Sequence, residues 1–168
     1  MWFCKQIWLF FLILALPIIA ISCGFTPLYS SHNVNEGIRG KLKIATIPGK
    51  DGHHLKEELV KRFGEPTSSA YSLNIAIKTI KINEVVSPNN EITSYRLIMT
   101  ANYDISNALA EIVLPTQKSI ARTGFSSASN STGYATQIAE EAAKKRLAIK
   151  ISEKISTRVS ILSENWLK

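Results

Sequence analysis

The positions of apolar side chains along the chain predict a strand and a helix at the start of a folded domain. Residues 41–47 alternate between apolar and polar side chains and stop at a Pro-Gly pair, which predicts a strand. Residues 51–63 carry apolar side chains at helical spacing, with Asp51 as a candidate N-cap and Gly64 just beyond the last turn. This segment therefore predicts a short amphipathic helix.

Two long strands joined by a turn are predicted next. Residues 71–86 begin with strict alternation and then change phase at Ile80 and Ile82, which predicts a bulge or a strong bend. A Ser-Pro-Asn-Asn turn fills residues 87–90. Residues 92–105 alternate again, so that one face of this strand is apolar and the other is largely polar.

A final strand region and a long helix complete the pattern. Residues 108–114 and 118–126 predict a further strand or strand pair, interrupted by Pro115. After a loop and helix cap at residues 130–133, residues 134–162 contain neither Gly nor Pro and predict one long helix. The early part of this helix carries an apolar stripe that consists of Tyr134, Ile138, Ala142 and Ile149.

The order of these elements predicts the fold class. Strands with one apolar face need a helical layer to cover that face, which gives a two-layer α+β domain. We expect a sandwich in which a mostly antiparallel four-stranded sheet is packed by two helices, within residues 41–168. No internal repeat is present, and the length of the region makes a second domain unexpected.

The first two dozen residues follow no such alternation. Residues 7–21 are uniformly apolar over about 15 positions, short of the roughly 20 needed to cross a bilayer as a helix. This length is typical of a signal peptide, and Pro17 can break the helix before a cleavage site. Ala20-Ile21-Ser22-Cys23 resembles a lipobox, in which a small residue precedes the cysteine whose sulfur receives a diacylglyceryl group. We therefore predict a cleaved lipoprotein signal peptide at residues 1–22 and lipid on Cys23.

Two alternatives would give the same apolar run, namely a plain membrane anchor with an incidental cysteine and a general secretion signal cleaved nearby. Ala20 stands where lipoboxes usually carry Leu, but Cys23 falls just where the apolar run stops, which favours lipidation. Cys4 is then removed, so the mature chain can form no internal disulfide. Residues 23–40 are interpreted as a lipidated N-terminus and tether. The diacylglycerol and the N-acyl chain on Cys23, palmitate among them, are the only bound groups expected.

Length and charge fit one compact, exported domain. Cleavage leaves residues 23–168, a length typical of a single domain. The formal net charge of +7 falls by one unit with the loss of Lys5. A basic balance favours contact with anionic lipid headgroups, phosphorylated glycans or nucleic acid, and export argues against nucleic acid. The densest basic run, Lys144-Lys145-Arg146, is interpreted as a solvated helix face.

The sequence contains no recognisable catalytic or metal-binding motif. His53 and His54 are adjacent, so on a helix they point about 100° apart and cannot share a metal as an i,i+4 pair can. A nucleophile elbow, a zinc-protease motif, a CxxC pair and a glycine-rich phosphate loop are absent from the sequence. We therefore expect neither an enzyme nor a metal site.

The segment after the predicted cleavage site resembles a known family. Cys23-Gly24-Phe25-Thr26-Pro27-Leu28-Tyr29 is similar to the CGF-x-PLY opening of the LptE family of LPS-assembly lipoproteins, as found in alphaproteobacteria. The resemblance covers essentially the whole mature chain, and its lipidated opening is the most specific part. Later segments that resemble the family in order and spacing are residues 71–73, 93–103, 125–129 and 134–135.

This resemblance implies a role in the Gram-negative envelope. Such proteins are non-enzymatic plugs in the lumen of the LptD outer-membrane barrel, which they help to fold. They also assist passage of lipopolysaccharide (LPS) to the cell surface, partly by binding it. Gly24, rather than Asp, after the lipidated cysteine implies release to the outer membrane in lipoprotein-sorting families. The implied location is therefore the outer membrane, facing the periplasm and anchored by lipid, with LptD and LPS as partners.

Basic residues on the predicted strands are the candidates for LPS contact, and the alternative for each is a scattered solubilising charge. Some family members use a basic residue in the turn before the third strand, whereas residues 87–90 here are uncharged, so that contact does not carry over. An alternative function is a general periplasm-facing binding or scaffold lipoprotein unrelated to LPS. The candidate LPS-binding residues are Lys78, Lys81, Arg96, Lys118 and Arg122.

Overall fold

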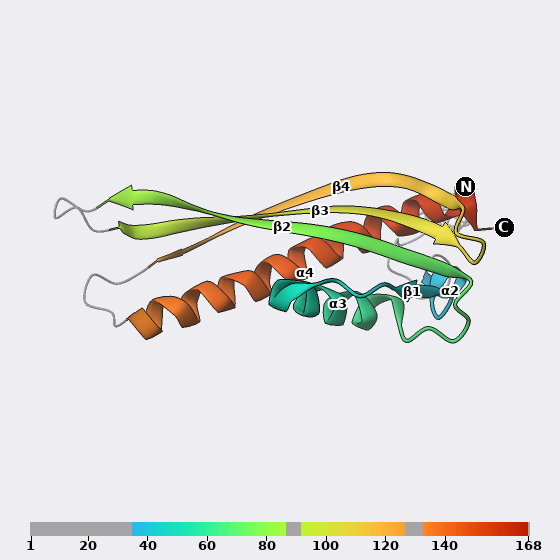
Figure 1. Cartoon of the computed structure of the whole chain (residues 1–168), viewed down its shortest axis with the longest axis horizontal. Coiled ribbons are helices and arrows are strands. Elements are labelled where there is room, and N and C mark those ends of the chain that lie inside the picture. Colours follow the sequence, from blue (N-terminus) through green and yellow to red (C-terminus); the bar gives the residue numbers. More distant parts are fainter. Residues whose placement is uncertain (1–34, 87–91, 127–132, 168) are drawn as a thin grey trace, which may run out of the picture. The chain divides into compact units, whose positions relative to one another are not determined.

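The computed structural model of the protein describes residues 35–86, 92–126 and 133–167, which form one sheet and its covering helices (Figure 1). The predicted signal peptide, Cys23 and most of the tether lie outside the described residues, as do the turn at 87–90 and most of the predicted cap at 130–133. The elements are α2 (Asn35–Ile38), β1 (Leu42–Ile44), α3 (Gly49–Phe63), β2 (Tyr71–Val86), β3 (Ile92–Asn107), β4 (Ile112–Ser126) and α4 (Gly133–Trp166).

The strands form a single sheet in the order β1-β2-β3-β4. β1 runs parallel to the first three residues of β2, whereas β2, β3 and β4 pair antiparallel over most of their length. The long helices α3 and α4 pack against each other on one face of the sheet (Figure 1). The predicted α+β sandwich, a mostly antiparallel four-stranded sheet packed by two helices, is confirmed.

The core lies between the sheet and the two long helices, and we call this side of the sheet the closed face. Leu55, Leu59 and Phe63 of α3 are buried there, together with the apolar side of α4 from Leu147 to Val159. Alternate residues of the strands supply the other half of the core. They are Leu73, Ile75, Leu97, Met99, Ala101, Tyr103, Ile105, Ala121 and Phe125.

The phase change predicted as a bulge in β2 has another cause. The register between β2 and β3 is unbroken from Tyr71 to Asn83, and the first shift comes only after Asn83. Ile80 and Ile82 therefore lie on the face opposite the core, where they are 45% and 43% exposed. The prediction of a bulge before Ile80 was wrong, because the apolar pattern moves to the other face while the pairing with β3 stays regular.

β4 is one strand, although Pro115 interrupts the predicted pattern. The register to β3 advances by two residues from Tyr103 to Ile105 but by three on β4, so the proline sits in an irregularity of the ladder. Proline lacks an N–H, and edge strands and bulges are where a sheet tolerates it. The preceding turn is closed by Asn107, whose Oδ1 accepts hydrogen bonds from the N–H groups of Leu109 and Glu111.

The start of α3 also differs from the prediction. Pro48, not Asp51, is the N-cap, and it makes no side-chain cap. Asp51 lies in the first turn and accepts a hydrogen bond from Thr79 Oγ1 at 2.9 Å. Its carboxylate therefore links the start of the helix to β2.

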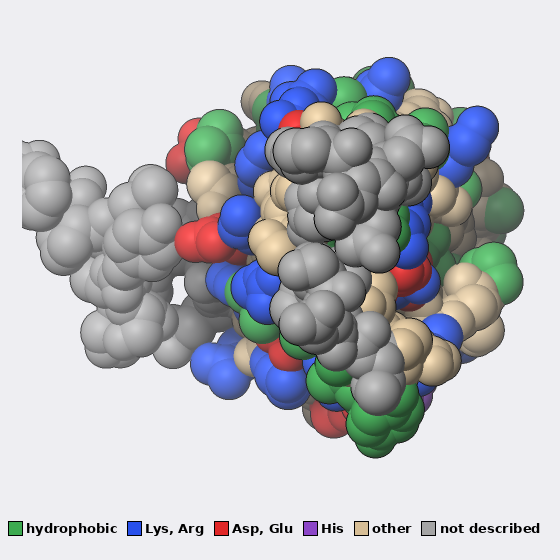
Figure 2. Space-filling model, turned by 90° about the vertical axis from the view of Figure 1, so that its left-hand side faces the viewer, with side chains coloured by type: hydrophobic (Ala, Val, Ile, Leu, Met, Phe, Trp, Pro, Cys, Tyr) green, Lys and Arg blue, Asp and Glu red, His purple; other side chains and the backbone are tan. Residues whose placement is uncertain are grey.

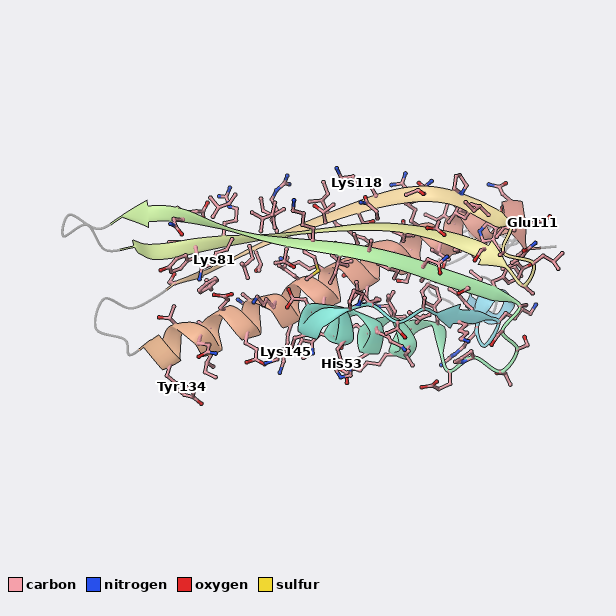
Figure 3. All side chains as sticks on the ribbon, in the orientation of Figure 1. His53, Lys81, Glu111, Lys118, Tyr134 and Lys145 are labelled. Carbon is pink, nitrogen blue, oxygen red and sulfur yellow. The ribbon has the colours of Figure 1, made fainter. Side chains whose placement is uncertain are left out.

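α4 buries a different side from the one that its early apolar stripe suggests. Tyr134, Ile138 and Ile149 are 72%, 47% and 44% exposed. The buried side begins with Ala143 and continues through Leu147 and Ile151. The predicted stripe therefore lies largely outside the core, and Tyr134 points away from the sheet (Figure 3).

Candidate ligand-binding face of the sheet

The second face of the sheet carries no helix among the described elements, and we call it the open face. The register places even-numbered residues of β2, β3 and β4 in rows across it. In Figure 3 the Lys118 side chain points away from both helices on this side. The central rows are Ala76–Asn102–Lys118, Lys78–Thr100–Ile120, Ile80–Ile98–Arg122 and Ile82–Arg96–Gly124.

Four isoleucines give the open face an apolar centre. Ile80 and Ile82 of β2 are exposed, and Ile98 and Ile120 beside them are half-buried. Ile80 and Ile98 are direct cross-strand partners, and Ile120 lies one row further on. A contiguous exposed apolar patch rimmed by polar residues is typical of an interaction surface.

Basic side chains surround this apolar centre. Lys78, Lys118 and Arg122 are exposed, and within the described part of the chain none of them forms an ion pair with an acidic residue. Arg96 differs, because it forms an ion pair with Glu84. With the sheet uppermost, Figure 2 shows Lys and Arg side chains at the top of the molecule with hydrophobic side chains between them. The open face therefore combines uncompensated positive charge with apolar surface.

Lys81 is not part of this group, although it was a candidate from sequence. It lies an odd number of residues from Lys78, so its side chain emerges on the closed face, toward α4 (Figure 3). There Lys81 Nζ contacts Glu140 Oε2 at 2.6 Å and lies 4.3 Å from the centre of the Tyr95 ring. Tyr95 in turn stacks on Phe125 with ring centres 5.0 Å apart. The structure gives Lys81 a packing role between sheet and helix.

Glu140 is the centre of this cluster, and the sequence analysis did not identify it. Its two carboxylate oxygens contact Lys81 and, at 3.0 Å, Lys144. The hydrogen bond from Lys81, followed by that from Lys144, holds the pKa of Glu140 below its usual value. The same pairing raises the pKa of Lys144. These contacts attach the first half of α4 to the end of the sheet.

Cations of α4 also cover the outer edge of β4. Arg146 Nη2, Lys150 Nζ and Lys154 Nζ donate to the backbone carbonyl oxygens of Gly124, Arg122 and Ile120 at 3.3, 3.3 and 2.6 Å. The donors are four residues apart and the acceptors two residues apart, so each helical turn meets the next outward carbonyl. Within the run 144–146, interpreted from sequence as a solvated face, Lys144 and Arg146 are therefore engaged in contacts.

The two adjacent histidines form no metal site in the described residues. His53 and His54 both approach Glu57, at 3.4 and 3.7 Å. The described residues contain no group of three potential ligands that could hold a metal ion. The open face is thus the surface with the clearest potential for binding.

A comparison with protein families identifies this chain by its sequence. The model of the LptE family, described as lipopolysaccharide-assembly, matches residues 40–159. The chain belongs to the LptE family. The match extends from just before β1 to the last turns of α4, so it includes the whole open face of this LptE-family protein.

Solved structures of lipoproteins share the fold. A protein of Caulobacter crescentus described as a lipoprotein has a TM-score of 0.60 at 19% identity, covering 76% of this chain and 93% of its own. The rare lipoprotein B of Shewanella oneidensis gives 0.56 at 14%, covering 74% and 96%. Lipoprotein B of Nitrosomonas europaea gives 0.57 at 14%, covering 75% and 85%. At these identities the likeness concerns the fold alone.

Two further comparisons concern relatives and membrane helices. No match to this LptE-family chain was found among curated proteins. Among the described residues, no helix combines the length and the apolar character needed to cross a membrane. The family match therefore carries the assignment, and it places the chain among LPS-assembly lipoproteins.

Proposed function

We propose that this LptE-family protein is an outer-membrane lipoprotein that serves as the plug and folding partner of the LptD barrel and binds LPS. The family match over residues 40–159 is the observation that carries the proposal. The role is non-enzymatic: the chain would assist assembly of LPS at the cell surface by binding and positioning. Lipid on Cys23 would hold it at the outer membrane, facing the periplasm.

The chemistry of the open face supports LPS as the ligand. LPS joins phosphate groups to acyl chains, so a binding surface needs both cations and apolar area. Lys78, Lys118 and Arg122 supply charge without an acidic partner in the described residues, beside the exposed Ile80 and Ile82. Charge-assisted hydrogen bonds from Lys and Arg to phosphate are among the stronger polar contacts in proteins.

The same face supports a position inside a barrel. The interior of a large outer-membrane barrel is polar, so a plug must present polar surface to it. Rows such as Ala76–Asn102–Lys118 provide such surface beside the isoleucines. The closed face and its helices supply the compact domain that a plug requires.

Co-purification tests the plug function directly. The lipidated protein is solubilised in detergent from cells that also produce tagged LptD, and the tag is used for recovery. We expect the two chains to be recovered together. Recovery of the lipoprotein only as a free monomer, at every expression level, would contradict the plug function.

Depletion separates this function from that of a general scaffold lipoprotein. Loss of the protein should reduce LPS at the cell surface, whereas a scaffold unrelated to LPS would leave surface LPS unchanged. Cys23→Ala tests the proposed anchor, because it removes the sulfur that would carry the lipid. It should lower the amount of the barrel complex and leave the unfolding free energy of the domain unchanged.

A further inference from the structure

The hydrogen bonds between β1 and β2 define which way the backbone of β2 points. Tyr71 N–H donates to the carbonyl of Lys41 at 3.1 Å, and the carbonyl of Leu73 accepts from Ala45 N–H at 3.0 Å. Backbone groups alternate in direction along a strand. The odd-numbered residues of β2 therefore direct their N–H and C=O groups away from β3, toward the outer edge.

This outer edge continues far beyond β1. β1 covers only Tyr71 to Leu73, while the register between β2 and β3 stays regular as far as Asn83. Across Ile75–Asn83, every second residue thus presents an outward donor and acceptor. Within the described part of the chain, no backbone or side-chain group bonds to them. α3 packs mainly on α4 and β1, and its Asp51 bonds the side chain of Thr79 rather than the backbone of this edge.

The opposite edge of the sheet, formed by β4, differs because its outward backbone groups have hydrogen-bond partners. Outward carbonyls of β4 accept hydrogen bonds from Arg146, Lys150 and Lys154 of α4. β4 also contains Pro115, whereas Ile75–Asn83 contains neither Gly nor Pro. Proteins usually blunt their exposed strand edges, because an open edge is a template for another strand. Among the described residues the β4 edge is thus covered and the β2 edge is not, which leaves β2 as the edge available to another strand.

We propose that the β2 edge from Ile75 to Asn83 accepts an extended segment of the partner barrel as an additional strand of the sheet. This inference rests on the proposed function, which supplies the partner. In strand addition the main chain provides the affinity and alternate side chains provide the specificity. A regular edge of this length spans about 27 Å at roughly 3.4 Å per residue, enough for a typical strand.

The side chains beside the edge define the chemistry of the added segment. On the open face it lies next to Lys78, Ile80 and Ile82, of which both isoleucines are more than two-fifths exposed. The segment should therefore place apolar side chains beside the isoleucines and an acidic side chain beside Lys78, which has no acidic partner in the described residues. A second copy of this chain fits less well, because its formal net charge is also strongly positive, at +7.

Proline substitution tests the edge without breaking the sheet. The N–H of Thr79 points outward, so Thr79→Pro removes one edge donor and keeps the ladder to β3. Thr79→Val removes the hydroxyl that bonds Asp51 but keeps the N–H. Ser126→Pro removes an outward donor from the opposite edge of the sheet, on β4, outside the central rows of the open face. The valine variant measures the effect of losing the side-chain hydroxyl alone. The Ser126→Pro variant measures the effect of a proline at the other edge, so the loss of the outward N–H at position 79 is specific to Thr79→Pro.

The variants are compared in full-length lipoprotein co-produced with tagged LptD. Thr79→Pro should lower recovery of the complex about fivefold, as expected for one lost backbone hydrogen bond. Thr79→Val and Ser126→Pro should leave recovery unchanged. In the wild-type complex, amide hydrogen exchange should slow at alternate residues of Ile75–Asn83 relative to the free protein.

Three other outcomes would contradict the proposal, and each would point to a different explanation. If wild-type chains co-purify with LptD, but Thr79→Pro binds equally well and the β2 amides gain no protection, strand addition is wrong and the plug function stands. A photocrosslinker at Ala76, exposed beside the edge, that joins two copies of this chain would assign the edge to a homodimer and also overturn the proposal. Failure of the wild-type pair to co-purify would contradict the proposed function itself.

Discussion

The closed and open faces of the sheet are built from alternate residues of the same three long strands, and they differ in almost every other respect. Leu97 and Met99 on the closed face are 1% and 0% exposed, while Ile80 and Ile82 on the open face are 45% and 43% exposed. The closed face meets two helices, whereas the open face meets none among the described residues. Adjacent residues of one strand therefore contribute in turn to the buried core and to the exposed surface.

This difference separates the determinants of stability from those of recognition. Burial of apolar area stabilises a fold by roughly 25 cal/mol per Å². Only the closed face gains this energy in full. Substitutions on the open face should therefore change binding with little effect on folding, and paired substitutions on neighbouring residues can test that separation.

The largest expected effect is at the core of the closed face. Leu97→Ala leaves a cavity beneath β3 and should lower the unfolding free energy by about 2–5 kcal/mol. The matched control is its neighbour on the open face, where Ile98→Ala should cost about 1 kcal/mol or less. Urea denaturation of the purified protein measures both. Equal losses at the two positions would show that the open face also contributes to the core.

The next effect concerns ligand binding on the open face. Lys78→Glu, Lys118→Glu and Arg122→Glu together should weaken LPS binding about tenfold or more, because each removes a charge-assisted contact to phosphate. Binding of the purified protein to LPS measures the loss.

The control for this variant changes the charge equally elsewhere. Lys50→Glu, Lys61→Glu and Lys145→Glu alter three exposed cations of α3 and α4, which pack on the closed side of the sheet. This triple variant should retain LPS affinity. If both triple variants lose affinity alike, the binding depends only on net charge and the open face is not its site.

A smaller effect is expected at the covered edge of β4. Lys154→Met removes the shortest of the three contacts to β4 carbonyls, 2.6 Å to Ile120 O, and should lower the unfolding free energy by about 0.5–1 kcal/mol. Lys145→Met, on the same helix and equally exposed but without a carbonyl contact in the described residues, is the control and should have no effect. Thermal unfolding compares the two. A wild-type melting temperature in Lys154→Met would leave the edge contact without a stabilising role.

The smallest effect depends on pH. The pKa of Glu140 is lowered in the folded protein, chiefly by its hydrogen bonds from Lys81 and Lys144. The carboxylate therefore stabilises the fold above its unfolded pKa of about 4.3, and this contribution is lost as pH falls through the lowered folded value. Glu140→Gln should be less stable than wild type by up to about 1 kcal/mol near neutral pH. The two should converge in acid.

Unfolding free energies measured from pH 7 down to pH 3 test this dependence. Lys81→Met in the same background provides a double-mutant cycle, because it removes the first contact of Glu140 and keeps a long apolar side chain. A constant difference between Glu140→Gln and wild type across this range would assign the effect to packing rather than charge.

The sequence predicted the elements well because alternation and helical spacing are local signals. The long hairpin, the amphipathic α3 and the long α4 all follow from such spacing. β1 is shorter than predicted, Leu42–Ile44 instead of residues 41–47. The length of β1 depends on how many of its residues pair with β2. The sequence of β1 alone carries no information about that pairing.

The errors occurred where an apolar residue does not face the core. Ile80 and Ile82 fit a strand on either face, so their change of phase resembled a bulge. Tyr134 and Ile138 share a helical stripe, but the sheet packs on another side of α4. Spacing identifies residues that share a face, and only the tertiary arrangement decides which face is covered.

The candidate site was predicted in part. Lys78, Arg96, Lys118 and Arg122 share the open face, as their even positions in paired strands allow. Lys81 was grouped with them because it lies on the same predicted strand as Lys78, although its odd separation from Lys78 places it on the other face. Its partner Glu140 is far away in sequence, so local analysis had no signal for that contact.

The contacts between α4 and β4 join two elements whose repeats differ slightly in length. Four residues of helix advance about 6.0 Å, and two residues of antiparallel strand advance about 6.8 Å. The mismatch therefore grows by about 0.8 Å per repeat. Flexible Lys and Arg side chains accommodate this over the two repeats that join the three contacts. The next cation, Arg158, makes no such bond to Lys118 O in the described residues. The register of β4 thus fixes the rotation of α4 over a short length, beyond which the core must set it.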